Sequence, residues 1–258
     1  MRADAFYSER QVFKPCAVIP VYNHEGAVAD VAGAIAAHNL PCLLVDDGSS
    51  APCRQVLDRL AESHSGEIIL LRHSANLGKG AAVMTGMRRA AELGFSHALQ
   101  IDADGQHRSS DIPLFLEQAR AHPDAMIAGS AQYDGHAPGL RVMARYLTHV
   151  WVWINTLSLQ IKDSMCGFRV YPLRAVMALD QSRRLGARMN FDIEVLVRLY
   201  WQGVEIINVP TKVSYPSDGR SHFRAGLDNF LISRLHATLF FGMLRRLPGL
   251  LARRWSFR

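Results

Sequence analysis

Residues 98–107, with the sequence ALQIDADGQH, join a short apolar run directly to a pair of acidic residues. The run 98–101 predicts a buried strand that ends at Asp102. Three similar runs earlier in the chain predict further strands at 16–20, 42–45 and 68–71. Helical patterns alternate with these strands, at 26–38, 52–63 and 79–93. This alternation predicts an α/β fold of the nucleotide-binding type, with a mostly parallel sheet covered on both faces.

The second half of the chain is less regular. Helical patterns are found at 141–161 and 191–201, and apolar runs at 166–171 and 204–209 predict strands. No internal repeat and no linker rich in Pro, Gly or Ser divides the chain. We therefore expect one domain with a C-terminal appendage.

The composition is that of an ordinary globular protein, with 258 residues, 49% hydrophobic and 20% charged. The net charge of +6 comes from the six arginines between residue 234 and the end, a stretch without any acidic residue. A uniformly basic surface is therefore not expected, nor is a nucleic-acid partner. The four cysteines form no paired motif, and the N-terminus has no apolar signal core, which predicts reduced thiols in a cytoplasmic protein.

Polar, turn-forming residues follow each of the four predicted strands of the first half. They read VYNHE at 21–25, DDGS at 46–49, NLGKG at 76–80 and DADGQH at 102–107. Ligands of parallel sheets bind at the carboxyl ends of the strands. We therefore expect these four loops to meet at one edge and form the functional site.

Asp102 and Asp104 are the most informative pair in these loops. Two carboxylates on a loop that leaves a strand are able to reach a hard divalent cation, and Mg²⁺ or Mn²⁺ is expected. Without a cation, the two acids would repel each other. An ordinary surface turn is the alternative for this motif when it is taken alone.

Two other loops carry candidate binding residues. Asp46 suits hydrogen bonds to a base or ribose, whereas Asp47 could instead cap the helix that follows. Lys79 lies in a glycine-rich turn that resembles a phosphate cradle, although the spacing of a P-loop is absent. A solvated lysine in the first helical turn is the alternative for Lys79.

Six motifs, taken together and in order, resemble the inverting family-two glycosyltransferases, and in particular the dolichyl-phosphate mannose synthase group. They are PVYN (20–23), VDDGS (45–49), NLGKG (76–80), DADGQH (102–107), DSMCGFR (163–169) and FDIEVLVR (191–198). The resemblance implies a nucleotide-sugar-dependent transferase with a Rossmann-like GT-A domain at 14–225. Residues 226–258 then form a tail outside this domain.

The resemblance also implies roles for individual residues. The nucleoside would be held by Pro20, Tyr22, Glu25 and Asp46. Asp102 and Asp104 would hold metal and diphosphate, with Gln106 beside them, and Ser221 and His222 of a late loop would contact the diphosphate. Asp192 matches the position of the catalytic base, although an acid that complements the helix dipole is the alternative. Candidates for contact with the acceptor are Arg141, Arg145 and Arg169.

Two departures from the family pattern concern the acceptor. The group usually has GSR after the metal loop, whereas this chain has GSA at 129–131, and the late acceptor-loop arginine is missing from 215–219. The loss of two phosphate-binding arginines favours a lipid-like acceptor with a hydroxyl or carboxylate. A polyprenyl-phosphate acceptor and a non-catalytic, nucleotide-sugar-binding relative are the alternatives.

The tail at 226–258 combines leucines and phenylalanines with arginines, and the helix at 141–161 carries Trp151 and Trp153. This pattern predicts an amphipathic helix in the headgroup layer of an anionic membrane, with the protein held peripherally on the inner face of the cell membrane. Pro248 is expected to break the helix. A helix packed on the domain, with solvated arginines, is the alternative.

Overall fold

The computed structural model describes residues 12–133, 139–214 and 224–256. The strands of the described part form one seven-stranded sheet in the order β3-β2-β1-β4-β6-β5-β7. These strands are β1 (Pro15–Val21), β2 (Cys42–Asp46), β3 (Ile68–Arg72), β4 (His97–Gln100), β5 (Met126–Tyr133), β6 (Arg169–Pro172) and β7 (Ile206–Val213). β6 runs antiparallel to both of its neighbours, and the other pairs of adjacent strands are parallel. The predicted mostly parallel α/β sheet is therefore confirmed.

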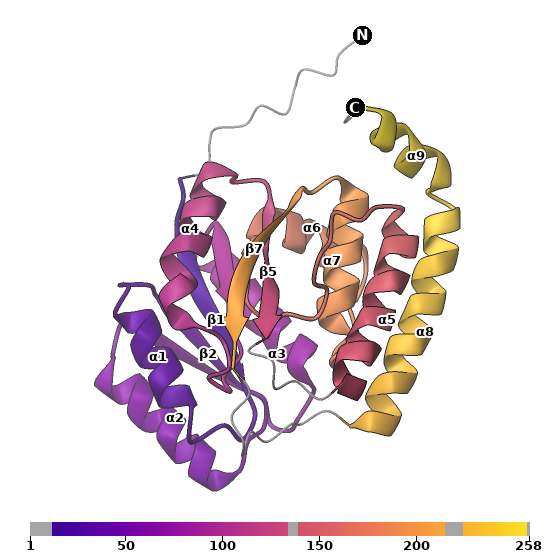
Figure 1. The fold of residues 1–258 in the computed structure, drawn as a ribbon. Coiled ribbons are helices and arrows are strands. Elements are labelled where there is room, and N and C mark those ends of the chain that lie inside the picture. Colours follow the sequence, from indigo (N-terminus) through magenta and orange to yellow (C-terminus); the bar gives the residue numbers. More distant parts are fainter. Residues whose placement is uncertain (1–11, 134–138, 215–223, 257–258) are drawn as a thin grey trace.

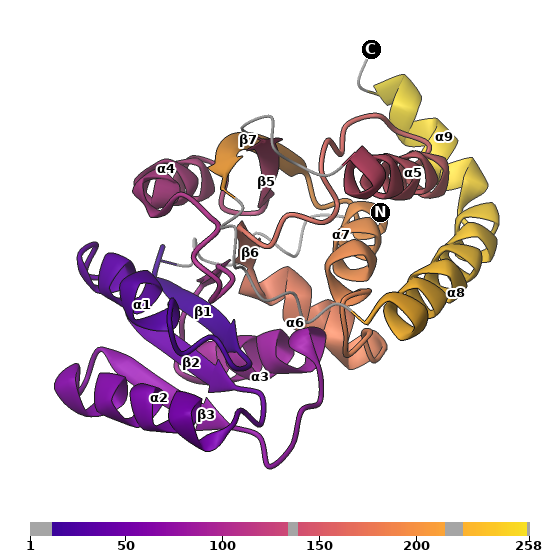
Figure 2. The same ribbon diagram turned by 60° about the horizontal axis from the view of Figure 1, so that its bottom comes forward.

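Helices cover both faces of this sheet (Figure 1). Their bounds are α1 (Val28–Ala36), α2 (Ala51–Ser63), α3 (Lys79–Glu92), α4 (Ile112–Ala121), α5 (Gly139–Thr156), α6 (Leu173–Ser182), α7 (Phe191–Gln202), α8 (Ala225–Leu244) and α9 (Leu247–Ser256). Buried side chains of α1, α2 and α4 form one core cluster with one face of the sheet. Those of α3, α6 and α7 form a second cluster on the other face, where α5 and α8 pack outside α7 (Figure 2).

The sequence-based prediction fails mainly in the second half, where α4, β5 and α6 were not expected. The helix predicted at 141–161 ends at Thr156, because Leu157 adopts a left-handed φ of 53° and the chain turns back. Trp153 Nε1 then donates to the carbonyl of Ile161 at 2.8 Å. The strand predicted at 166–171 begins only at Arg169, because a preceding turn is held by the Asp163 carboxylate.

The C-terminal helices are part of the folded core. α8 buries Leu235, Leu239 and Met243 in the same cluster as α7. The break between α8 and α9 comes earlier than predicted, and Pro248 lies in the first turn of α9, where a missing N–H costs no hydrogen bond. Among the described residues, we find no helix whose length and apolar character would let it cross a bilayer.

Candidate active site

The loops that follow β1 and β2 are joined by hydrogen bonds at the carboxyl edge of the sheet. The backbone N–H of Asn23 donates to Ser49 Oγ at 3.1 Å, and the N–H of Ser50 donates to Asn23 Oδ1 at 2.8 Å. Asn23 has a left-handed φ of 53°, which asparagine tolerates better than most residues. The expected meeting of these two loops is therefore present.

Asp47 fixes the glycine-rich loop in front of α3. Its carboxylate accepts the backbone N–H groups of Leu77 and Gly78, each at 2.8 Å, and His73 Nδ1 lies 2.8 Å from it. The alternative that Asp47 caps the next helix is wrong, since that helix, α2, has Ser50 at its N-cap position. Asp47 instead connects the loop after β2 to the start of α3 and so positions Lys79.

The residues expected to hold a nucleoside lie at the same edge. Asp46 is completely buried, and it accepts the Ser49 N–H and Arg72 Nε, each at 2.8 Å. The other three residues with this predicted role are at or just after the end of β1, and they are Pro20, Tyr22 and Glu25. Their contact with a nucleoside stays a prediction.

A lysine joins the two most important predicted carboxylates. Lys79 Nζ lies 2.8 Å from Asp102 Oδ1 and 2.9 Å from Asp102 Oδ2. The same Nζ lies 2.9 Å from Asp192 Oδ2, so one ammonium group bridges the end of β4 and the first turn of α7. The alternative of a solvated lysine is wrong, because only 15% of the Lys79 side chain is exposed.

The charges in this cluster shift one another's pKa values. Burial opposes ionisation of Asp102, but Lys79 and His107 outweigh it and hold the pKa of Asp102 well below its usual range. Burial and the negative charge of Asp102 together raise the pKa of Asp104. Burial alone would lower the pKa of Lys79, yet Asp102 and Asp192 raise it above the ordinary value. The cluster is therefore built around negative charge that a cation must balance.

Asp192 is supported from behind by a buried polar network. Gln100 Nε2 donates to Asp192 Oδ1 at 3.2 Å, and Arg169 Nη1 donates to the Asp192 backbone carbonyl at 2.7 Å. Arg169 also donates to the Ser164 carbonyl at 2.8 Å and to the Tyr171 hydroxyl at 3.3 Å. Arg169, expected to contact an acceptor, is completely buried, and in this position it supports Asp192.

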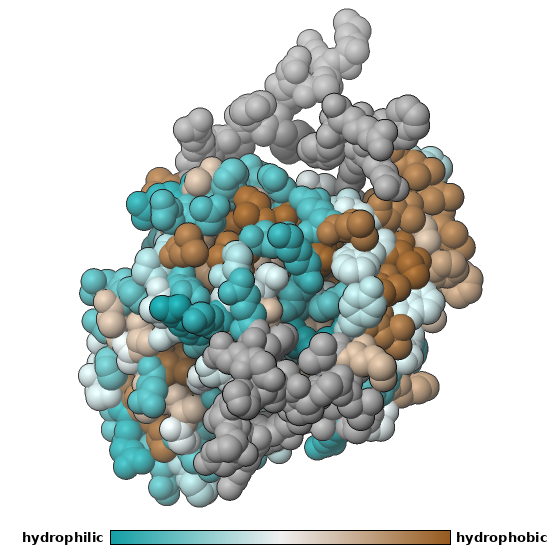
Figure 3. Space-filling model, viewed as in Figure 1, coloured by the Kyte–Doolittle hydropathy of each residue, from teal (hydrophilic) through white to brown (hydrophobic). Residues whose placement is uncertain are grey.

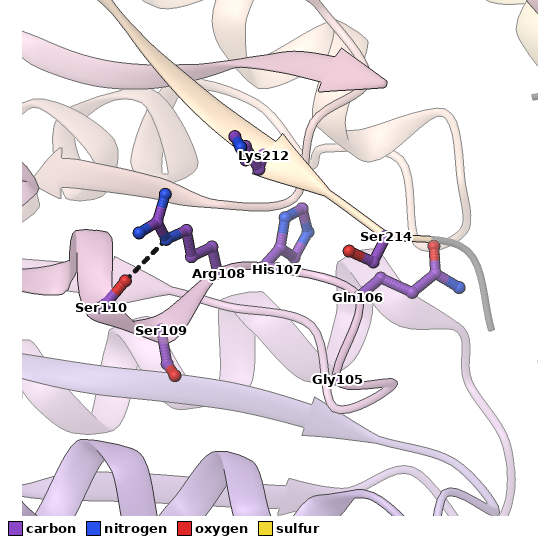
Figure 4. Close-up of a pocket in the computed structure, with 8 residues that line it drawn as sticks. All are labelled: Gly105, Gln106, His107, Arg108, Ser109, Ser110, Lys212 and Ser214. Carbon is purple, nitrogen blue, oxygen red and sulfur yellow. Dashed lines mark hydrogen bonds between the residues drawn. The ribbon is translucent and has the colours of Figure 1, made fainter. Parts of the chain in front are cut away.

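The loop after β4 continues past the acidic pair into a shallow hollow of about 310 Å³. The Gln106 backbone N–H donates to Asp104 Oδ1 at 3.0 Å, and His107 pairs with Val213 of β7. Figure 4 shows the Arg108 side chain, which donates to Ser110 Oγ, extending toward the strand that carries Lys212. The hollow is lined by Gly105, Gln106, His107, Arg108, Ser109, Ser110, Lys212 and Ser214.

Of the remaining predicted site residues, the structure describes the side-chain contacts of Arg145 only. Arg145 Nη2 donates to both oxygens of Asp163, at 2.9 Å and 2.8 Å, and Asp163 also accepts the N–H of Ala131 at 3.2 Å. Arg141 lies in the first turn of α5, but its side chain is outside the described part of the structure. Ser221 and His222 lie outside the described residues.

Comparison with known proteins identifies the family. The family model for glycosyl transferase family 2 matches residues 16–176. The chain belongs to this family. It is therefore a glycosyltransferase, as the resemblance of its motifs predicted.

Two family 2 relatives act on lipid phosphates according to their names. The UDP-N-acetylglucosamine–dolichyl-phosphate N-acetylglucosaminyltransferase of Methanococcus voltae is 26% identical over 213 residues, which cover 77% of this chain and 84% of that protein. The undecaprenyl-phosphate mannosyltransferase of Micrococcus luteus is 26% identical over 243 residues, which cover 92% of this chain and 97% of that protein.

Solved structures share the fold of this family 2 chain. A glucosyl-3-phosphoglycerate synthase from Mycobacterium tuberculosis, in complex with Mn²⁺, UDP and glucosyl-3-phosphoglycerate, matches with a TM-score of 0.62 and 15% identity, over 90% of this chain and 80% of that chain. A mannosyltransferase from Pyrobaculum calidifontis, in complex with GDP-Man and Mn²⁺, matches with a TM-score of 0.57 and 16% identity, over 93% of this chain and 73% of that chain. At this identity, the match shows the GT-A fold.

The residues at the acidic pair fit a hard divalent cation. The possible donors are the carboxylates of Asp102 and Asp104, which are oxygen ligands of the kind that Mg²⁺ and Mn²⁺ prefer. Gly167 leaves room for the Asp102 carboxylate, because a Cβ there would collide with it. Within the described ranges, no three His, Cys, Asp or Glu side chains are grouped to hold a metal. A few protein ligands, completed by water and substrate phosphates, are typical of Mg²⁺ sites.

Some functional residues of this family 2 member were missed in the sequence. Gln100 and Tyr171 belong to the network behind Asp192, and Tyr171 donates its hydroxyl proton to Gln100 Oε1 at 3.1 Å. Gln100 carried a usable signal, since it is a lone amide in an otherwise apolar strand. Asp163 begins the motif DSMCGFR, but the sequence does not show its role, which depends on a turn that only the folded chain forms.

Proposed function

We propose that this chain transfers a sugar from a nucleotide-sugar to a lipid acceptor at a membrane surface, with inversion at the anomeric carbon. The observation that carries this proposal is the Lys79 bridge, which brings Asp102 of the predicted metal pair next to Asp192, the predicted base. The names of the relatives, which specify dolichyl-phosphate and undecaprenyl-phosphate, support a lipid acceptor. The UDP and GDP-Man complexes of the structural neighbours support a nucleotide-sugar donor.

Each part of the site then has a chemical task. A bound Mg²⁺ or Mn²⁺ would offset the charge on the departing nucleoside diphosphate. Asp102 and Asp104 would hold that cation, with Gln106 beside them. We assign the donor contacts to Pro20, Tyr22, Glu25 and Asp46 at the carboxyl edge of the sheet, and to Ser221 and His222, which lie outside the described residues. Gln100 donates to the carboxylate of Asp192 and Arg169 to its backbone carbonyl, and these bonds hold Asp192 in the place where Lys79 joins it to Asp102.

The chemistry of the acceptor decides whether Asp192 must accept a proton. A polyprenyl phosphate, favoured by the relatives, arrives as an anion and needs no base. A hydroxyl acceptor needs one, and a base in hydrogen-bond reach is the usual solution. The second candidate, a lipid hydroxyl or carboxylate, is favoured by Ala131 at the position of a missing arginine and by the pairing of Arg145 with Asp163.

An exposed apolar face supports the membrane location. We call it the α5/α8 face. Hydrophobic side chains gather over these two helices at the right of Figure 3. Its members are Met143, Leu147, Trp151 and Ile154 of α5 and Leu227, Phe230, Phe241 and Leu244 of α8. The tail adds arginines without acids from residue 234 onward, which suits anionic lipid on the cytoplasmic leaflet. We propose that residues 226–258 and α5 together hold the GT-A domain on the membrane.

Release of nucleoside diphosphate tests the enzyme assignment. The protein is incubated with nucleotide-sugars, Mn²⁺ and vesicles that contain either polyprenyl phosphate or polyprenol. We expect release that depends on one of the two lipids and falls by about 100-fold or more in Asp104→Asn, because charge stabilisation at the leaving group is lost. The control Asp124→Asn changes an exposed acid and should behave like the unaltered protein. Equal release by the Asp104 variant would remove the catalytic assignment.

A further inference from the structure

Lys79 holds together two carboxylates that the proposed reaction must use separately. Its ammonium lies within 2.9 Å of oxygens of both Asp102 and Asp192. We infer that Lys79 is a positioning residue that fills the place of a cation in the free protein and makes metal binding depend on the nucleoside diphosphate. This inference rests on the proposed function, because it assumes that Asp102 binds the metal.

The two carboxylates depend on Lys79 to different degrees. Asp192 also has Gln100 Nε2 at 3.2 Å and Arg169 Nη1 at 3.7 Å from its Oδ1. Asp102 has, besides Lys79, a weaker contact with His107 Nε2 at 3.8 Å. Loss of the ammonium would therefore leave Asp192 balanced by Arg169, whereas Asp102 would lose its main counter-charge. Asp102 is the group that a new cation would compensate.

Lys79 and a divalent cation compete for the same oxygens. Both oxygens of Asp102 already face the ammonium of Lys79. A divalent cation bound to the same carboxylate would lie close to this ammonium, and the two positive charges would repel each other. The lysine therefore lowers the affinity of the site for the metal alone.

A nucleoside diphosphate changes this balance because it brings negative charge. The lysine side chain has a flexible four-carbon stem and three donors, and an ammonium–phosphate hydrogen bond is a strong one. When Lys79 turns to the phosphate, Asp102 is released to the metal. Metal and nucleotide then raise each other's affinity by the same factor, as linkage requires.

The test is a titration of the full chain with Mn²⁺, in which the electron paramagnetic resonance signal of free Mn²⁺ reports binding. It is run without nucleotide and with UDP or GDP. In Lys79→Met, we expect Mn²⁺ alone to bind about tenfold more tightly than in the unaltered protein, and the enhancement by nucleotide to be largely lost. Lys79→Arg keeps the charge and should keep weak binding of the metal alone. Lys162→Met removes an exposed lysine and serves as the control.

The direction of the change in Mn²⁺ affinity separates this inference from a purely structural role of Lys79. If Lys79 only held the fold together, its removal would weaken Mn²⁺ binding under both conditions, and that result would overturn the inference. Lys79→Gln provides a second neutral variant if Lys79→Met does not fold. If no variant binds Mn²⁺, with or without nucleotide, the metal site of the proposed function is wrong and the inference is lost with it.

Discussion

Acidification should loosen the contact between α8 and α5 through His236. This side chain is 5% exposed, and its Nδ1 lies 3.4 Å from Asn155 Nδ2. The ring packs against Trp151 with centroids 5.9 Å apart, and no hydrogen-bond partner of Nε2 is found among the described residues. Burial lowers the pKa of His236 from 6.5 to about 4. The folded protein therefore keeps this imidazole neutral at a pH where the unfolded chain protonates it.

The sign and size of the effect follow from this shift. Between the two pKa values, His236 binds a proton in the unfolded chain but stays neutral in the folded protein. The stability present above pH 6.5 is therefore lost as the pH falls toward 4. A difference of this size corresponds to about 3 kcal/mol in total, of which about 2 kcal/mol is already lost near pH 5.

Urea unfolding at about pH 7.5 and about pH 5 measures how much free energy of unfolding is lost through protonation of His236. The unaltered protein should lose about 2 kcal/mol more between the two conditions than His236→Leu does, since leucine has no proton to bind. His122→Leu changes an exposed histidine and should keep the full pH dependence. An identical loss of stability in the unaltered protein and in His236→Leu would refute the reasoning.

Two further predictions concern the α5/α8 face and Gly80, which follows Lys79 at the start of α3. Phe230→Ser combined with Phe241→Ser should reduce flotation with anionic vesicles about tenfold or more, because two exposed aromatic groups no longer insert. Leu114→Ser, on α4, should leave flotation unchanged, and equal flotation of both variants would contradict the assigned face. Gly80→Ala should lower the free energy of unfolding by about 1–3 kcal/mol, because its Cβ would collide with the start of α7. Gly33→Ala, with open space around it, should be neutral or stabilising in the same thermal or urea melt.

The helices and strands of the first half of the fold could be predicted because each has a characteristic hydrophobic pattern in its own residues. β2, for example, is a continuous apolar run that passes directly into Asp46, Asp47 and Gly48. β5 has no such signal, since it contains Gly129 with Ala128 and Ala131 close to it, and both residue types are depleted in strands. Gly129 is required by packing, because a Cβ there would lie 2.7 Å from Cys166 Sγ and from the Phe168 carbonyl oxygen. Such a requirement exists only once the chain is folded.

The site was predicted in pieces and connected by the structure. The loops that carry Lys79, Asp102 and Asp192 were each singled out by their residues, and the parallel sheet explains why the first two share an edge. The bridge from Lys79 to Asp192 joins segments that are far apart in sequence, and it depends on how α7 packs against α3. The burial of Arg169 follows from its place on the antiparallel strand β6, and the sequence does not show that this strand runs opposite to the others of the sheet.

The packing of α8 has a consequence for how the protein is made. Its buried side chains Leu235, Leu239 and Met243 close a core whose other members lie as early as Cys16 and Val18 of β1. On the ribosome, this layer stays open until α8 has left the exit tunnel. The apolar side chains of β1 in this cluster therefore lack part of their cover until α8 has been synthesised, and apolar surface that stays exposed for that time favours binding of a chaperone or of lipid to the nascent chain.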